Sequence, residues 1–305
     1  MRVLYVSTLD YGANPAVDAI AHGLENSLHQ AGISMHVMSA DFRTRGWQEK
    51  QGAAVDAGIS ARVDGMVLYV NDADAPAAAV QRARSAGIPV FSFERPHYDV
   101  EGSVVYANFN HGVFMTEYLA SLLPPGARVA VIGGPPVVDD IELLHGLVHG
   151  VQRAGLTLVN DPFDTRYRNL IDVADGGRLA ARNVLADFPQ LDGLVPFNDE
   201  TLLGTLEALR ETGRLSEMKM VSRNGTPAAV QAVAEGLTDG TWDLDCPGIG
   251  AAVGELALRQ LVGGETLRGE LKLAPIGRMV TAAEAAAWVP WSDRVTYRPL
   301  TFGLD

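Results

Sequence analysis

Short apolar runs alternate with amphipathic stretches along most of the chain, and this alternation constrains the fold more than any other feature. "RVLYVST" (residues 2–8) has the character of a buried strand, and "NPAVDAIAHGLENSLHQAG" (residues 14–32) has the spacing of a helix. Asn14 suits the N-cap of that helix, Pro15 its first position and Gly32 its end. Apolar strands that alternate with helices predict a mainly parallel sheet covered on both faces.

The alternation runs through the chain twice. The first series ends near residue 108, and the second extends from a helix predicted over residues 110–126 to one predicted over residues 227–236. One more helix is predicted over Ile249–Gly263, after the second series is complete. The 305 residues suit two lobes of about 150 residues each. We therefore expect an α/β protein with two doubly wound parallel-sheet lobes.

The net charge and the lengths of the apolar runs limit which kinds of molecule the protein is expected to bind. A net charge of −13 argues against nucleic acid and anionic membranes, because phosphate binding needs a basic face, and it favours a soluble monomer. No run approaches the roughly 20 apolar residues of a membrane span. The single cysteine, Cys246, excludes an internal disulfide and does not decide the compartment. "MRVLYVST" shows no leader before the first strand, so we expect either a cytosolic protein or a chain whose leader has been removed.

Motifs for cofactors, metals and catalysis are weak. "VIGGPP" lacks the glycine spacing of a phosphate loop, and its prolines remove backbone donors. His145 and His149 lie one helical turn apart, but no further metal-ligand pattern accompanies them. Cys246 has no base beside it in sequence, and no G-x-S-x-G elbow is present. We therefore expect no cofactor, no metal and no enzymatic activity.

The predicted strand ends carry polar residues in both series. Ligands of open α/β sheets bind beyond the carboxyl ends of the strands, so two lobes of this kind predict a cleft for a small hydroxylated or charged molecule. An asparagine at such a position can also be a turn residue or a helix cap, and Asp139-Asp140 can simply stabilise a helix N-terminus. The strand-end residues are Thr8 to Tyr11, Asn71, Asp72, Glu94, Arg95, Asn108, Gly133, Gly134, Asn198, Asp199, Arg223, Asn224, Asp243 and Asp245.

Three stretches, in this order, resemble the sugar-type (ribose-binding-protein-like) periplasmic solute-binding proteins of ABC importers. Those proteins share a type I fold with the ligand-binding half of lac-repressor-type regulators. The resemblance covers about residues 2–275. The three stretches are "VDGMVLYVNDADAPAAAVQRARSAGIPVFSFER", "LDGLVPFNDETLLGTLEALRETG" and "VSRNGTPAAVQAVAEG".

The resemblance implies two lobes that close around a ligand by a hinge motion. The implied N-terminal lobe comprises residues 1–108 and 246–275, and the implied C-terminal lobe comprises residues 109–245 and 276–305. Three chain crossings are implied, near Ala107–Asn110, Asp243–Cys246 and Ala274–Gly277.

The resemblance also implies ligand contacts. Asn14, Asn71 and Asn198 match polar contacts of the family, and Glu94-Arg95 stands where the family has Asp-Arg. The family's aspartate before Gly-Thr is here Asn224, and the aromatic residue before it is Arg223. The family's aromatic pair after the proline is absent, so we hypothesise that Tyr11 supplies stacking instead. The candidate ligand-binding residues are Asp10, Tyr11, Asn14, Asn71, Glu94, Arg95, Asn108, Asp139, Glu142, Asn198, Arg223, Asn224 and Asp243.

These departures leave the ligand open. The acids at Asp139–Glu142 replace a family arginine and favour an amine-bearing ligand, whereas Arg95 and Arg223 equally favour a carboxylated sugar. Arg223 can alternatively form a salt bridge with Asp243 or Asp245.

The resemblance implies a solute-binding protein that captures a small sugar-like ligand in an interlobe cleft and delivers it to a membrane permease. The alternative is a ligand-sensing module of a regulator or a sensor-kinase system, without its own DNA-binding segment. The implied location is periplasmic or extracellular, with the leader absent from this chain; the alternative is cytoplasmic.

Overall fold

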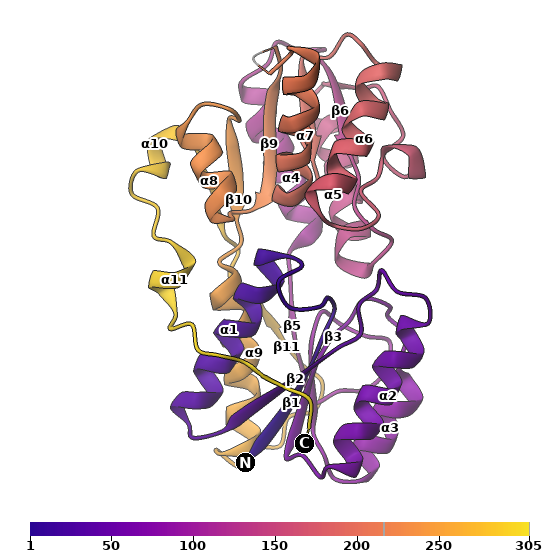
Figure 1. Cartoon of the computed structure of the whole chain (residues 1–305), viewed down its shortest axis with the longest axis vertical. Coiled ribbons are helices and arrows are strands. Elements are labelled where there is room, and N and C mark those ends of the chain that lie inside the picture. The colour runs from indigo at the N-terminus through magenta and orange to yellow at the C-terminus, as the bar shows by residue number, and fades with distance from the viewer. Residues whose placement is uncertain (216, 305) are drawn as a thin grey trace. The chain divides into compact units, whose positions relative to one another are not determined.

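A computed structural model of the chain describes residues 1–215 and 217–304, which form two compact units. Unit 1 contains Met1–Tyr106, Cys246–Pro275 and the tail that starts at Pro290. Unit 2 contains Ala107–Asp245 and Ile276–Val289. Figure 1 shows the strands and helices of each unit.

Unit 1 is built on a seven-stranded parallel sheet with the strand order β11-β5-β4-β3-β1-β2-β13. Its strands run nearly uninterrupted through apolar residues, as expected for a sheet that is buried on both faces. The elements of unit 1 are β1 (Arg2–Ser7), α1 (Pro15–Gln30), β2 (Ser34–Ser39), α2 (Trp47–Ser60), β3 (Gly65–Tyr69), α3 (Ala77–Ser85), β4 (Val90–Phe93), β5 (Gly102–Val105), α9 (Cys246–Leu261), β11 (Glu270–Leu273), α11 (Trp291–Arg294) and β13 (Thr301–Phe302).

Helices cover both faces of the unit 1 sheet. Helices α2 and α3 pack on one face, where Val55 and Val80 meet Leu4, Met66 and Val90 of the strands. Helices α1 and α9 lie together on the other face (Figure 1). The N-terminus of α1 follows the predicted pattern, because the side chain of Asn14 accepts a hydrogen bond from the backbone N–H of Ala16.

Unit 2 contains a six-stranded sheet with the strand order β12-β10-β9-β8-β6-β7. All of its pairings are parallel except that of β12 with β10. The elements of unit 2 are α4 (Asn108–Ser121), β6 (Arg128–Ile132), α5 (Val138–Arg153), β7 (Thr157–Leu158), the 3-10 helix η1 (Thr165–Tyr167), α6 (Ala174–Asp187), β8 (Gly193–Pro196), α7 (Asp199–Thr212), β9 (Lys219–Asn224), α8 (Pro227–Ala234), β10 (Gly240–Asp243), β12 (Arg278–Val280) and α10 (Ala282–Ala285).

Two apolar clusters bury the two faces of the unit 2 sheet. On one face, Leu147 of α5 and Met115 of α4 pack against Val131 and Val195. On the other face, α6, α7 and α8 pack against alternate residues of the same strands, such as Leu194.

The chain passes between the units at the three places that the resemblance implies, namely after Tyr106, Asp245 and Pro275. A fourth pass, between Val289 and Pro290, is additional to the expected three. The tail was expected in the C-terminal lobe, but the structure places it in unit 1. The physical reason is that β13 extends the unit 1 sheet by pairing with β2, and that Trp291 is buried with 2% of its surface exposed.

Among the described residues, no helix is both long and apolar enough to cross a membrane.

Candidate ligand-binding site

In unit 1, predicted site residues gather at the carboxyl ends of β1 and β3. The hydroxyl of Thr8, just after β1, donates to Oδ1 of Asn71, just after β3, at 2.5 Å. Asn71 is buried, and its Nδ2 atom has no hydrogen-bond partner among the residues that the structure describes. Asn14 is also buried at the N-cap of α1. Asn71 therefore offers a donor at this edge for a ligand oxygen.

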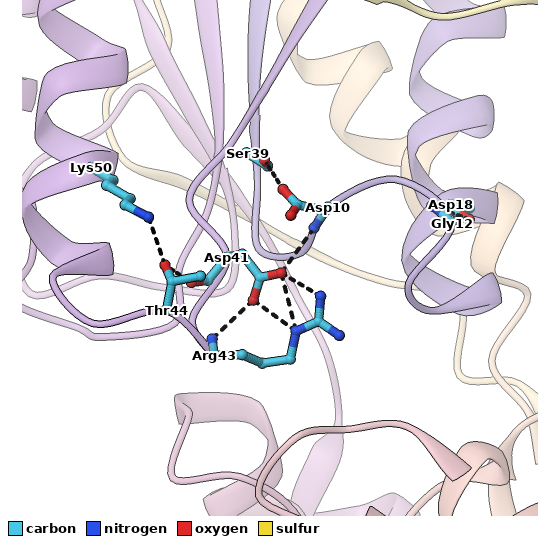
Figure 2. A network of polar contacts seen from close by, with 8 residues as sticks. All are labelled: Asp10, Gly12, Asp18, Ser39, Asp41, Arg43, Thr44 and Lys50. Atoms are coloured by element: carbon cyan, nitrogen blue, oxygen red, sulfur yellow. Dashed lines mark hydrogen bonds and ion pairs between the residues drawn. The ribbon is translucent and has the colours of Figure 1, made fainter. Parts of the chain in front are cut away.

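Asp10 belongs to a polar network that ties the loop after β1 to the loop after β2 (Figure 2). The Asp10 carboxylate accepts a hydrogen bond from the hydroxyl of Ser39. Arg43 donates from Nε to Asp41 at 2.9 Å and also forms an ion pair with it. Burial by itself raises the pKa of Asp41, but the hydrogen bonds and the charge of Arg43 outweigh it and hold that pKa below its ordinary value. The network brings a guanidinium group to this edge of unit 1.

Glu94 and Arg95 follow β4 and differ in burial. Glu94 is buried and has a backbone φ of 63°, a left-handed conformation that is costly for this residue type. Arg95 is exposed and lines a pocket of about 940 Å³ together with residues such as Glu101 and Arg268.

Tyr11 lies next to α1 and the tail. Its hydroxyl is 2.9 Å from Nε2 of His22, and its ring packs against Phe302 with a centroid separation of 5.7 Å. Its hypothesised stacking on a ligand stays a prediction, and within unit 1 its ring is held by these two neighbours.

In unit 2, Arg223 is the centre of a buried network at the carboxyl end of β9. Its side chain is 5% exposed. Nη1 donates to Oδ1 of Asn108 at 2.9 Å, and Nη2 donates to Oδ1 of Asp140 at 3.1 Å. Asn108 in turn donates to Glu142 at 3.2 Å. The structure thus brings together four strand-end or helix-start residues and gives Arg223 the partner Asp140, instead of a salt bridge with Asp243 or Asp245.

Asn198 joins the carboxyl end of β8 to the loop before α6. Its Oδ1 atom accepts from the backbone N–H of Thr201 at 3.0 Å, which makes it the N-cap of α7. Its Nδ2 atom donates to Asp172 at 2.5 Å. Asp172 is buried and has a left-handed φ of 51°. Asn198 is therefore both a helix cap and a link to an acidic residue at the same edge.

Several carboxyl groups at this edge have raised pKa values. Burial, followed by the neighbouring Asp139, raises the pKa of Asp140 well above its ordinary value, although Arg223 opposes this effect. The pKa of Glu200 is raised to about 7, first by burial and then by the charges of Asp199 and Asp172. Burial and the neighbouring carboxyl groups therefore disfavour the charged forms of Asp140 and Glu200 at this edge of unit 2.

The remaining predicted residues lie at the ends of β9 and β10. Asn224 has a φ of 121°, and a Cβ on the following Gly225 would lie 2.5 Å from Cα of Asp243. Asp243 is buried and accepts a hydrogen bond from Nε1 of Trp288 at 2.8 Å. This close packing explains why residue 225 is a glycine.

The structure adds residues that the strand-end prediction missed. Asp41 and Arg43 follow β2, whose end was not included among the expected positions. Arg168 and Asp172 lie in the loop before α6, and the Arg168 Nε atom donates to the carbonyl of Gly134 at 2.6 Å. That loop has no apolar run from which its position is predictable. In the described residues no cluster of histidine, cysteine and acidic side chains could hold a metal ion; His145 and His149 instead pack against Phe163 and Phe109.

Residues 6–265 match the sequence profile of a family described as the periplasmic binding protein domain. The chain belongs to this family. Its members are solute-binding proteins and not enzymes, as the sequence predicts.

Curated relatives agree with this assignment. The ribose import binding protein of Bacillus subtilis is 25% identical over 234 residues, which cover 76% of this chain and 72% of the relative. The xylitol-binding protein of Mycolicibacterium smegmatis is 28% identical over 200 residues, which cover 63% of this chain and 54% of the relative.

Solved structures establish the fold of this periplasmic binding protein. A periplasmic solute-binding protein of an ABC transporter from Actinobacillus succinogenes, with bound D-allose, superposes with a TM-score of 0.82 at 19% identity and covers 94% of this chain and 99% of its own. A solute-binding protein from Bacillus halodurans with bound myo-inositol superposes with a TM-score of 0.77 at 22% identity. The match covers 94% of this chain and 96% of that protein. The prediction of a type I fold with two mostly parallel sheets is confirmed.

Proposed function

We propose that this periplasmic binding protein captures a small hydroxylated ligand, of the sugar or polyol class, and delivers it to the permease of an ABC importer. The observation that carries the proposal is the gathering of polar side chains at the carboxyl ends of the strands in each unit. Unit 1 contributes Asn71 with an unused buried donor, and unit 2 contributes the network around Arg223. Such groups suit the many donors and acceptors of a polyol.

The proposal assigns ligand contacts to residues at the carboxyl ends of the strands in each unit. The thirteen candidate residues from the sequence remain the proposed contacts, and Arg43, Arg168 and Asp172 are added to them. Support for the ligand class comes from relatives whose names specify ribose, xylitol and xylose, and from similar structures that contain allose or inositol. The names of relatives also support an ABC importer as partner and a location outside the cytoplasmic membrane.

The first test is a thermal-shift screen of the purified protein against pentoses, hexoses, polyols, sugar acids and amino sugars. A ligand present at 100 times its Kd stabilises the folded state by about 2.7 kcal/mol, which raises the Tm by several degrees. We expect at least one hydroxylated compound to do so. Absence of any shift across all these classes contradicts the proposed function.

The second test uses the ligand found in the screen. We expect Asn71→Ala to weaken binding about tenfold, or about 1.4 kcal/mol, because the buried Nδ2 donor is lost. The control is Asn183→Ala, since Asn183 is a partly exposed residue of unit 2 that bonds only to the carbonyl of Arg166 in the described hydrogen bonds. Titration calorimetry measures the Kd of the ligand for both variants. Equal Kd values for the two variants would show that Asn71 does not contact the ligand.

A further inference from the structure

A pocket of about 360 Å³ lies inside unit 1, and its lining residues come from β1, β2, α1, the loop after β1 and the tail. This volume is at the lower end of the usual range for small-molecule sites, so the pocket suits a molecule with a single ring. None of the described residues that line it is a lysine, an arginine or a histidine. The apolar lining residues are Leu9, Val17, Ala21, Val37, Leu300 and Phe302.

Tyr5 is a polar lining residue on the α1 face of the sheet. Its neighbours Leu4 and Val6 pack beneath α2 and α3, and side chains alternate along a strand, so Tyr5 faces the opposite side. The Tyr5 side chain is buried, and its Oη atom has no hydrogen-bond partner among the described residues. Burial raises the pKa of Tyr5, and the nearby Ser7 hydroxyl opposes this effect only in part, so Oη keeps its proton. A buried donor of this kind indicates that a bound molecule supplies the acceptor.

Two carboxylates that line the pocket already accept hydrogen bonds from the protein. Asp10 accepts from the hydroxyl of Ser39, and Asp18 accepts from the backbone N–H of Gly12 (Figure 2). A carboxylate on a bound molecule would be repelled by both. An ammonium group has only donors, so it would leave Oη of Tyr5 without an acceptor. A hydroxyl group, in contrast, accepts from Tyr5 without adding charge.

We propose that this pocket binds a small uncharged molecule with one apolar ring and a hydroxyl group, such as a phenol or a cyclic alcohol. The hydroxyl oxygen accepts from Oη of Tyr5, and the ring packs against the apolar lining residues. The site is additional to the one proposed for the transported ligand. Of the candidate contacts of that ligand, the pocket includes only Asp10 and Tyr11.

The test compares probes that share a six-membered ring and differ in one group. The probes are phenol, benzene, benzoate, benzylamine and cyclohexanol, which is the saturated counterpart of phenol. Titration calorimetry with the full-length protein at pH 7 measures the Kd of each probe. We expect phenol to bind about fivefold more tightly than benzene, because its hydroxyl provides the acceptor for Tyr5. Benzoate and benzylamine should bind more weakly than phenol.

Tyr5→Phe tests the hydroxyl contact, because it removes Oη and keeps the ring. We expect this variant to bind phenol about fivefold more weakly and to change the affinity for benzene less than twofold. The control is Tyr118→Phe, which removes a hydroxyl of unit 2 that donates to the carbonyl of Asp239. Phe302→Ala is a second variant in case Tyr5→Phe does not fold. Phe302 is an exposed residue of the tail that lines the pocket, so its loss should weaken phenol and benzene alike.

The outcomes separate this site from the proposed function. If benzene binds as tightly as phenol, or if Tyr5→Phe leaves the affinity for phenol unchanged, the hydroxyl contact is overturned. If no probe binds, or if benzoate or benzylamine binds best, the proposed pocket ligand is wrong. The hydroxylated ligand found in the thermal-shift screen should bind to Tyr5→Phe with an unchanged Kd. A weaker affinity of that ligand for Tyr5→Phe would overturn the separation of the two sites.

Discussion

Arg223 is a buried cation. Its neighbours therefore determine how well its charge is stabilised and whether its guanidinium group can contact a ligand. Its guanidinium group bonds to Asp140 and Asn108, which belong to the first turns of α5 and α4. These two contacts of Arg223 therefore link the ends of β9, α4 and α5 inside unit 2. A substitution at Arg223 has a structural effect in addition to any effect on the ligand.

We expect Arg223→Met to destabilise the protein by about 3 kcal/mol, because it leaves the buried Asp140 without its guanidinium partner. Urea unfolding of the ligand-free protein measures this loss. The control is Arg182→Met, which removes an arginine of the exposed pair with Glu211 and should change stability by less than about 1 kcal/mol. Equal unfolding midpoints for the two variants would show that the Arg223–Asp140 pair contributes nothing to the fold.

The sequence indicates the positions of such residues better than their partners. Asn14 was predicted as a cap from its place before Pro15, because capping is a local interaction, and the structure confirms it. The pairing of Arg223 with Asp140 spans 83 residues, and no local pattern specifies it. The proposed binding role of Asn198 is likewise inseparable from its role as the cap of α7, where loss of the cap costs about 1 kcal/mol.

Helix pairs in both units approach each other through reciprocal glycines. A Cβ on Gly250 of α9 would lie 2.0 Å from the carbonyl oxygen of Ile20, and one on Gly23 of α1 would lie 2.0 Å from that of Pro247. The same arrangement recurs in α4 with α5, through Gly112 and Gly146, and in α6 with α7, through Gly177 and Gly204. Backbone contacts between these helices therefore depend on residues without side chains.

We expect Gly250→Ala to destabilise the protein by about 2 kcal/mol, because the added methyl group overlaps a backbone oxygen. Helix propensity alone predicts the opposite sign, since alanine is favoured over glycine by up to about 1 kcal/mol. Gly52→Ala in α2 is the matched control, because its Cβ would meet its neighbours at an ordinary 3.8 Å. Thermal unfolding should show a lower Tm for Gly250→Ala and no decrease for Gly52→Ala. A raised Tm for Gly250→Ala would refute the close-contact explanation.

The type and order of most elements follow from their apolar period, and the structure has the predicted helices α1 and α9 in their expected segments. Elements with few apolar residues were not predicted. β11 has the sequence ELKL with a half-exposed pattern, and β12 has only three residues. Their positions depend on pairing with β5 and β10, which lie far away in sequence. The glycines within the helices also did not indicate from the sequence which helices pack together, because their role depends on the partner helix.

The four passes of the chain make each unit a composite of separate segments. Unit 1 is assembled from three segments, of which the last is the tail that starts at Pro290. The tail contributes the buried Trp291, the edge strand β13 and a stacked contact between Tyr297 and His22 at 4.0 Å. Repetition of strands and helices predicts two lobes, but the tail has no such period, which is why its unit was predicted incorrectly.

We expect a chain truncated after Val289 to have a Tm several degrees lower than that of the full chain, because unit 1 loses these contacts. Trp291→Ala tests the same contacts with a single substitution and should cost about 3 kcal/mol. Ser292→Ala, at the exposed neighbouring position, is the control. If truncation leaves the Tm unchanged, the tail does not stabilise unit 1.

The division of unit 1 into distant segments also sets an order for folding during synthesis. When the ribosome has released residues up to Asp245, most of unit 2 is available, whereas unit 1 still lacks α9, β11 and the tail. Until then the sheet face beside α1 stays uncovered, and the edges of β5 and β2 remain open to other chains. The lobe that begins first is thus completed last, and until then its open strand edges can pair with other chains.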